Sequence, residues 1–197
     1  LVIGFTVPFA RLVQRLVKDR PDRIEEAIRA KYLDRELLRT PTLALDRARL
    51  ELLRMGDRVR EMLGRILPAV LTGDRWILLE IETLDDEIDA LQGYIISYLG
   101  EISKSRLSEE GTREMIGLMG ATNDLEAIGD LIETNMVNLG LARIEDGLSV
   151  SPATRQVLTE LHSAVAESLD LSMMALAEKN ADAARRALPA RLVDQEV

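Results

Sequence analysis

The stretch ILLEIETLDDEIDALQGYIISY, residues 77–98, decides the fold class of this chain. Apolar residues recur along it at alternating steps of four and three. That spacing places them in one stripe along a helix, whereas a strand would need a step of two. The stripe consists of Ile77, Ile81, Leu84, Ile88, Leu91, Ile95 and Tyr98. The sequence therefore predicts a long helix with one face buried in a core.

A helix with the same spacing is predicted before this one. It should start at Thr40-Pro41, because threonine is a good N-cap and proline suits the first helical position. Pro68 is predicted to kink this helix or to end its regular part. Asp74 should then cap the central helix, which is expected to end near Lys104. The apolar stripe of the first helix is Leu45, Ala48, Leu52, Met55, Val59, Met62 and Ile66.

Two more helices are predicted after the central one. Ser108 is expected to cap a third helix, with Glu109 and Glu110 in the first turn, where the helix dipole favours negative charge. Ser151-Pro152 is expected to start a fourth. The third helix carries Met115, Leu118, Leu125, Ile128, Ile132 and Leu139. No strand pattern occurs, and short turns make helices antiparallel neighbours. The expected fold is all-α, a long antiparallel three-helix bundle.

Composition excludes several classes of function. Of 197 residues, 47% are hydrophobic but only 3% are aromatic, which favours an aliphatic helical core. The chain has no cysteine and one histidine, so thiolate metal sites and Cys or Ser-His-Asp catalysis are not expected. A net charge of −9 argues against nucleic acid as a partner and suits cations better.

The two segments before the first bundle differ in composition. Residues 1–17 are apolar first and basic afterwards, as at the cytoplasmic end of a transmembrane helix. They are expected to be the end of a transmembrane or membrane-proximal helix; an ordinary amphipathic helix is the alternative. Residues 18–41 are predicted to be a charged linker, followed by a three-helix bundle over 42–146.

The end of the chain suggests an internal repeat. Residues 176–196 can be laid over residues 71–88, with a turn and an acidic helix in the same order. Residues 147–197 are therefore expected to begin a second three-helix unit, which is incomplete here.

Carboxylates gather on the central and third helices. Helical spacing places Glu82, Asp86 and Asp89 on one face, beside the core stripe. If the two helices are antiparallel neighbours, their acidic stripes can meet across a groove. The acidic and amide residues are Glu82, Asp85, Asp86 and Asp89 on the central helix, and Asn123, Glu126, Asp130 and Glu133 on the third.

Two interpretations of these stripes remain open. Carboxylates that face one another repel, and hard cations such as Mg²⁺, Ca²⁺, Mn²⁺ or iron remove that cost. Acidic helix faces are more often simply solvated. Gly129 favours a close approach at this point, because glycine costs about 1 kcal/mol relative to alanine inside a helix. The approach could serve tight helix packing or leave room for a metal.

No catalytic arrangement is visible. Ferritin-like di-iron sites use Glu-x-x-His from two helices. The single histidine, His162, is preceded at that spacing by Thr159 and lies on neither acidic helix. The expectation is that the chain is not an enzyme and that His162 is a helix-surface residue.

Two of these acidic segments resemble a known family. NDLEAIGD at 123–130 resembles the signature helix of the PhoU domain, and DDEIDAL at 85–91 resembles the acidic motif on its preceding helix. The resemblance covers about residues 42–197. It implies two three-helix bundles related by a repeat.

The resemblance also implies metal ligands. Family members carry Glu/Asp-x-x-x-Asp motifs that bind iron or other divalent cations on the bundle surface. The matching residues imply a metal set of Glu82, Asp85, Asp86, Asp89, Glu126 and Asp130, with Asn123 and Asp124 as neighbours.

The membrane-like start, the linker and the bundle together resemble the bacterial sodium-dependent phosphate (Na⁺/phosphate) cotransporter family. The implied role is a cytoplasmic regulatory domain of an inner or plasma membrane protein, with phosphate and sodium handled by the full-length transporter. Leftover apolar faces on such a bundle usually meet another bundle, and a homodimer is one partner to consider. The alternatives are a free-standing PhoU-type regulator of an ABC phosphate transporter and sensor kinase, or a helical scaffold or dimerisation module that binds no metal.

Overall fold

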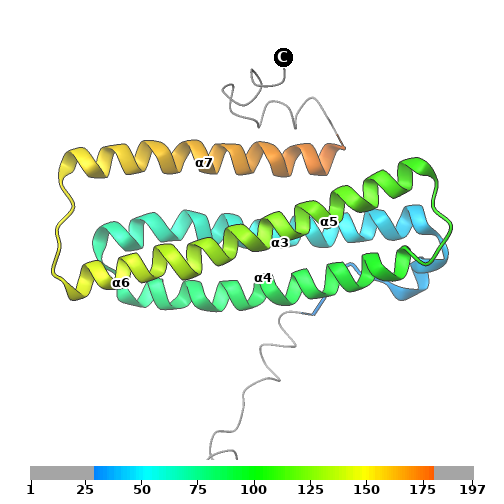
Figure 1. Cartoon of the computed structure of the whole chain (residues 1–197), viewed down its shortest axis with the longest axis horizontal. Helices are drawn as coiled ribbons and strands as arrows, with labels where there is room; N and C mark the ends of the chain where they lie inside the picture. The colour runs from blue at the N-terminus through cyan, green and yellow to red at the C-terminus, as the bar shows by residue number, and fades with distance from the viewer. Residues whose placement is uncertain (1–28, 180–197) are drawn as a thin grey trace, which may run out of the picture.

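The computed structural model describes residues 29–179, which form an all-α bundle with no strand in that range (Figure 1). The predicted fold class is confirmed. The expectations for residues 1–17, for residues 18–28 of the predicted linker, and for the second unit from residue 180 on lie outside the described residues. The elements are the 3₁₀ helix η1 (Arg35–Arg39), α3 (Pro41–Thr72), α4 (Arg75–Ile102), α5 (Glu109–Asp130), the π-helix η2 (Leu131–Val137), α6 (Asn138–Glu145) and α7 (Pro152–Glu178).

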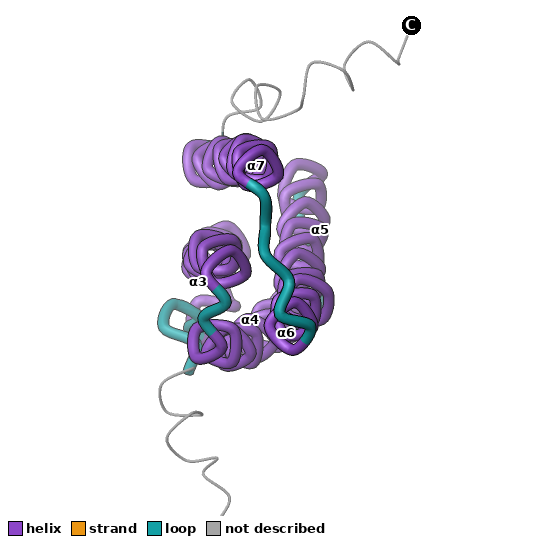
Figure 2. Tube along the Cα trace, turned by 90° about the vertical axis from the view of Figure 1, so that its left-hand side faces the viewer, coloured by secondary structure: helices purple, strands orange, loops and turns teal. Residues whose placement is uncertain are grey.

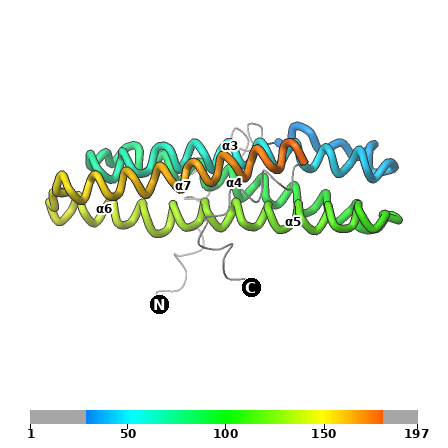
Figure 3. Tube along the Cα trace, turned by 90° about the horizontal axis from the view of Figure 1, so that it is seen from above, coloured from blue at the N-terminus to red at the C-terminus, as the bar shows by residue number. Residues whose placement is uncertain are grey.

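The long helices run side by side along one axis (Figure 3). α3, α4 and the continuous α5–η2–α6 rod alternate in direction, and α7 returns along α3 (Figures 1 and 2). The turn between α3 and α4 is short because Gly73 takes a φ of 78°, a left-handed conformation that glycine adopts without strain. α4 and α5 are therefore antiparallel neighbours, as the acidic stripes require if they are to meet.

The core is formed by the apolar stripes that the sequence predicts on α3 and α4. Most of these side chains are completely buried, and α5 and η2 close the core from the other side with a smaller apolar face. Burial of such side chains contributes about 1.5–3 kcal/mol each. The largest fully buried side chains are Leu45, Leu52, Met55, Met62, Ile66, Leu78, Ile81, Ile88, Leu91, Ile95, Leu99 and Ile102.

Three of the predicted N-caps are present. The Asp74 carboxylate accepts hydrogen bonds from the backbone N–H groups of Trp76 and Ile77 at 3.1 and 3.2 Å. Ser108 and Ser151 accept in the same way at the starts of α5 and α7. Thr40 occupies the N-cap position of α3 but makes no side-chain capping bond there.

Removal of the α4 cap should have a moderate cost. Asp74→Ala leaves two backbone N–H groups without their acceptor, so we expect the free energy of unfolding to fall by about 1 kcal/mol. Urea denaturation followed by circular dichroism measures this loss. Asp57→Ala, which removes an exposed carboxylate paired with Arg60 at the surface of α3, is the control and should change stability by less than about 0.5 kcal/mol. Equal losses in the two variants would contradict the capping role.

Two local features differ from the sequence prediction. α3 does not end at Pro68 but continues to Thr72, so the predicted end of the regular helix is wrong, whereas the alternative of a kink stays a prediction. A proline removes a single helix hydrogen bond, and the tertiary contacts on both sides of Pro68 keep the helix intact. The third predicted helix is interrupted by the seven-residue π-helix η2, which directly follows Asp130.

α7 is attached to α3 by polar contacts along its length. Near its start, His162 Nε2 lies 2.7 Å from the carbonyl oxygen of Leu63. At its end, Lys179 Nζ lies 2.9 Å from Asp46 Oδ1 and 3.3 Å from Glu114 Oε1, which ties α7 to both α3 and α5. His162 is thus half-buried at a helix contact rather than on an open surface.

Residues of α5 and α7 line an apolar groove, together with Leu63 and Leu67 of α3. The side of α7 that faces α5 is not covered by another described helix. Apolar residues on both walls include Leu118, Leu125, Ile128, Leu158, Leu161 and Val165.

Candidate metal centre

Three carboxylates from two helices converge at the middle of the bundle. Asp85 and Asp89 lie one turn apart on α4, and Asp130 is the last residue of α5. One carboxylate oxygen from each of them lies within 4.8 Å of the other two. We call these three residues the acidic cluster. The acidic stripes of the two helices therefore meet, as the antiparallel arrangement predicts.

Asp85 is the buried member of the cluster. It exposes 9% of its surface, and its Oδ1 atom is buried without a hydrogen-bond partner. An ionised carboxylate in this position is costly unless a cation or a proton compensates it. The unpartnered oxygen is the feature that distinguishes this cluster from an ordinary solvated acidic face.

Gly129 explains how Asp85 fits against α5. A Cβ atom at this position would lie 2.8 Å from Asp85 Oδ1 and 3.3 Å from Ile88 Cδ1. Any larger residue would therefore push against α4 at the point where the acidic cluster forms. The glycine among the carboxylates is needed for close approach of the two helices, and that approach also leaves room for the Asp85 carboxylate.

The π-helix η2 starts immediately after the cluster. A π-turn inserts one extra residue per turn, and such segments are frequent at functional sites. η2 contains Glu133, which is half-buried and adds negative charge near Asp85 and Asp89. Helical periodicity does not reveal a π-helix, so η2 could not be predicted from the sequence.

The electrostatics of the cluster are those of carboxylates without a counter-charge. Burial, followed by the negative charges of Asp89, Asp130 and Glu133, raises the pKa of Asp85 from 3.8 to about 7. Burial and Asp130 also raise the pKa of Asp89, and burial with Asp130 and Asp89 raises the pKa of Glu126. Within residues 29–179, no lysine or arginine counteracts these rises.

The donor set fits a hard divalent cation. Ca²⁺ takes oxygen ligands at about 2.3–2.6 Å and Mg²⁺ at about 2.0–2.1 Å, so two ligands on one ion are at most about 4–5 Å apart. The three oxygens of the cluster all lie within 4.8 Å of one another, which is compatible with this range. Asp85, Asp89 and Asp130 could therefore hold one ion together with water. With oxygen donors alone, the set suits Mg²⁺, Ca²⁺, Mn²⁺ or iron.

The other residues of the predicted metal set lie around the cluster. Glu126 is half-buried one turn before Asp130. Glu82, Asp86 and Asn123 are exposed and contribute no atom to the acidic cluster. Asp85 and Asp89 therefore lie on the face of α4 that points toward α5. Spacing alone predicted that Glu82 and Asp86 share a face with Asp89.

Gly129 offers a direct test of the helix approach. In Gly129→Ala, the new methyl group should displace the Asp85 carboxylate, and we expect divalent-cation binding to weaken at least about tenfold. We also expect the variant to be about 1–2 kcal/mol less stable than Gly120→Ala, because alanine gains helix propensity at an open site but not at a crowded one.

Gly120 is the matched control, since it lies on the same helix and a Cβ atom there meets nothing within 4 Å. Urea denaturation and a cation titration of both variants provide the measurements. Equal stability and equal cation binding in the two variants would show that the approach of α5 to Asp85 is not tight.

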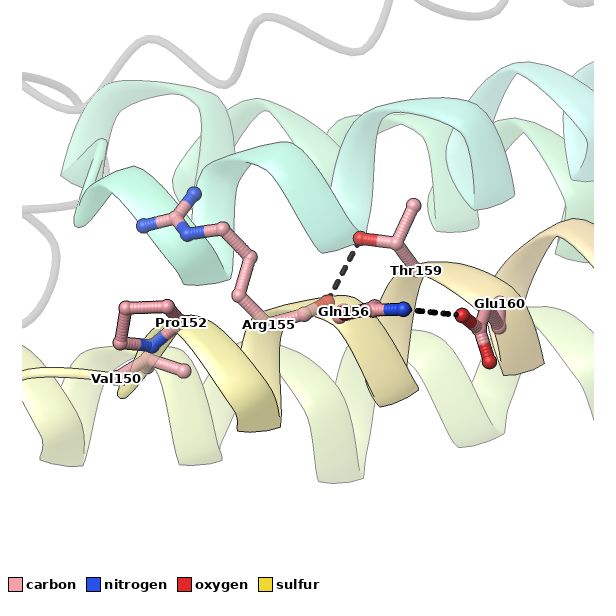
Figure 4. A pocket seen from close by; sticks show the side chains of 6 residues that line it. All are labelled: Val150, Pro152, Arg155, Gln156, Thr159 and Glu160. Carbon is pink, nitrogen blue, oxygen red and sulfur yellow. Dashed lines mark hydrogen bonds between the residues drawn. The ribbon is translucent and has the colours of Figure 1, made fainter.

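A second hollow lies at the start of α7, away from the cluster (Figure 4). Its polar groups are largely bonded to the protein: Gln156 donates to Glu160, Thr159 donates to the Arg155 carbonyl, and the Arg155 guanidinium donates to Leu71 O at 3.4 Å. No residue of the predicted metal set lines it. The lining residues are Val150, Pro152, Arg155, Gln156, Thr159 and Glu160.

Comparisons with known proteins agree with the helical bundle and its acidic motifs. The PhoU domain model matches residues 52–137, which include α4, α5 and the acidic cluster. No solved structure matches the chain significantly.

Several bacterial relatives share a name that refers to phosphate. The chain is 29% identical over 185 residues to the "Putative inorganic phosphate export protein YjbB" of Escherichia coli O157:H7. It is 28% identical to the proteins of the same name from Escherichia coli K12 and Salmonella typhimurium LT2. Each match covers 94% of this chain and 34% of the relative, so the chain spans about a third of their length. Together, the domain match and these relatives support a PhoU-like, phosphate-related protein.

Proposed function

We propose that this chain is the PhoU-like regulatory domain of a phosphate-transporting membrane protein, and that it responds to a divalent cation bound by the acidic cluster. In this proposal the chain is not an enzyme. The phosphate connection is supported by the PhoU match at residues 52–137 and by relatives named for phosphate export.

One observation supports the proposed response to a divalent cation. The Oδ1 atom of Asp85 is buried without a hydrogen-bond partner, and it faces two further carboxylates from Asp89 and Asp130. A bound cation would supply the missing positive charge at this point. Asp130 comes from α5 and the other two residues from α4, so the chain's own ligands would draw the two helices together.

This arrangement gives the domain two states that differ in stability. Without a cation, the three carboxylates repel and weaken the contact between α4 and the start of η2. With a cation, the same side chains hold that contact. A change in the packing of α4 against the α5–η2 rod is the signal that we propose the domain passes to its transporter.

The membrane context and the sodium dependence are finer parts of the proposal. Among the helices of residues 29–179, none is long and apolar enough to cross a membrane. The apolar and then basic composition of residues 1–17 supports a membrane part before the bundle. We propose a sodium-coupled transporter of the inner or plasma membrane with this domain in the cytoplasm.

The proposal is tested with the full-length protein in membrane vesicles. We expect phosphate flux to depend on Mn²⁺ on the cytoplasmic side, and Asp85→Asn/Asp130→Asn to remove that dependence while flux itself remains. Glu82→Gln/Asp86→Asn, which changes two exposed acids outside the cluster, is the matched control. Flux that is independent of Mn²⁺ in every variant would overturn the cation-dependent regulation, and absence of phosphate flux would overturn the transporter context.

The groove between α5 and α7 supports a second candidate, a dimerisation module. Its uncovered apolar walls would be buried if a second copy packed there. In this case the acidic cluster would bind no cation. Sedimentation equilibrium of the chain distinguishes the two, since Ile128→Asp in the groove wall should convert a dimer into a monomer. A monomeric wild-type chain would exclude this candidate.

A further inference from the structure

The chain segment before the bundle is held by side chains of two different helices. Residues 29–34, which we call the strap, precede η1 and lie across the N-terminal half of α3. Four of their backbone polar groups are bonded to α3 or α4 side chains. These groups are the carbonyls of Arg29 and Asp34 and the N–H groups of Lys31 and Tyr32.

Glu51 is the centre of this attachment. Its side chain is completely buried, and one carboxylate oxygen accepts the N–H groups of Lys31 and Tyr32 at 2.8 and 2.7 Å. The other oxygen accepts from Arg54 at 2.5 Å, and Arg54 also donates to the carbonyl of Arg29 at 3.0 Å. Charge-assisted hydrogen bonds of this kind are about twice as strong as neutral ones.

α4 holds the other end of the strap. The Tyr98 hydroxyl donates to the carbonyl of Asp34 at 2.6 Å, and Leu33 packs against the core. The strap thus bridges α3, through Glu51, and α4, through Tyr98. Its fixed position depends on how these two helices sit relative to each other.

The attachment rests on a small number of contacts. The strap itself forms no helix or strand, so most of its backbone hydrogen bonds are made to side chains of α3 and α4. If the strap leaves, the Glu51 carboxylate gains water in place of the two N–H groups, and Leu33 loses its contact with the core. A carboxylate that can be hydrated after release costs far less than one that stays buried without a partner.

We propose that residues 29–34 are a releasable strap, docked on α3 and α4 through Glu51, which sets how the bundle is joined to the chain before it. When docked, the strap fixes the point at which the preceding chain leaves the bundle. When released, residues 29–34 become a tether of six residues, which can extend about 20 Å from η1. This role is independent of cation binding at the acidic cluster.

Amide hydrogen exchange of the whole chain tests the proposal. In Glu51→Gln, we expect the amides of Lys31 and Tyr32 to exchange at least tenfold faster, because the amide group cannot provide the charged acceptor. Core amides such as that of Ile95 should keep their protection. Trypsin should cut after Lys31 at least tenfold faster in the same variant.

Glu87→Gln is the matched control, because Glu87 is a half-buried carboxylate paired with Arg58 at 3.0 Å but lies away from the strap. It should leave exchange at Lys31 and Tyr32 unchanged. Unchanged exchange at these two amides in Glu51→Gln would overturn the proposal. If Glu51→Gln instead speeds amide exchange across the whole bundle, Tyr98→Phe is the deciding variant. Faster exchange confined to residues 29–34 in Tyr98→Phe supports the strap. Unchanged exchange, or faster exchange across the bundle, overturns it.

Discussion

Asp85→Asn should make the cation-free bundle more stable at pH 8 by about 2 kcal/mol while leaving its stability at pH 4 nearly unchanged. The pKa of Asp85 is raised from 3.8 to about 7, so the folded chain holds this proton more tightly than the unfolded chain. The contribution of the proton is complete below pH 3.8 and is lost as the pH rises through about 7. Asparagine cannot ionise, so the variant lacks this loss.

Urea denaturation in EDTA at a series of pH values between 4 and 8 measures this effect. The wild-type free energy of unfolding should fall relative to that of Asp85→Asn as the pH rises. The pKa of Asp89 is also raised, so the ionisation of Asp89 lowers the free energy of unfolding of both proteins as the pH rises. Glu82→Gln is the control, because Glu82 is exposed and outside the acidic cluster. A constant difference between wild type and Asp85→Asn at every pH would contradict a buried, unpartnered carboxylate.

Mn²⁺ should stabilise the bundle strongly. A ligand that binds only the folded state at 100 times its dissociation constant adds about 2.7 kcal/mol to the free energy of unfolding. For a domain of this size we expect the melting temperature to rise by about 5–10 °C. EDTA should reverse the rise, because the cation compensates the repulsion among Asp85, Asp89 and Asp130.

Differential scanning calorimetry at matched ionic strength measures this rise. Na⁺ at the same ionic strength separates specific binding from general screening of the net charge of −9. In Asp85→Asn/Asp130→Asn, Mn²⁺ should give no more stabilisation than Na⁺. If Na⁺ raises the melting temperature of the wild type as much as Mn²⁺ does, the effect is general screening. The same holds if Mn²⁺ raises the melting temperature of this variant equally.

The helices and most of their ends could be predicted from the sequence, because they depend on local patterns. The apolar stripe of the central helix is buried, and Asp74, Ser108 and Ser151 cap their helices. α3 continues past Pro68 because tertiary packing outweighs the loss of one hydrogen bond. Local patterns cannot show such an outcome.

The acidic cluster could be predicted only in part. Spacing indicates that the stripes of α4 and α5 can meet, but neighbouring positions on a helix differ by about 100°. The choice between Asp85 and Asp86 as the inward residue depends on the packing of α4, and spacing alone favoured Asp86, whereas the structure has Asp85 there. The π-helix η2 also arises from packing, since its residues keep an ordinary helical pattern.

The strap could not be predicted from any motif. Glu51 lies 19 or 20 residues from its backbone partners, and an acidic residue on α3 looks like any solvated position. Its burial results from the path of residues 29–34 over the helix. Such contacts depend on tertiary structure and leave no periodic pattern.

Isothermal titration of the cation-free chain with Mn²⁺, beside Asp85→Asn/Asp130→Asn and the control Glu82→Gln/Asp86→Asn, tests the central claim most directly. We predict stoichiometric binding to the wild type and the control, and a loss of affinity of at least about 100-fold in the cluster variant. Absence of binding to the wild type at millimolar Mn²⁺, or equal binding to all three proteins, would contradict a metal centre at Asp85, Asp89 and Asp130.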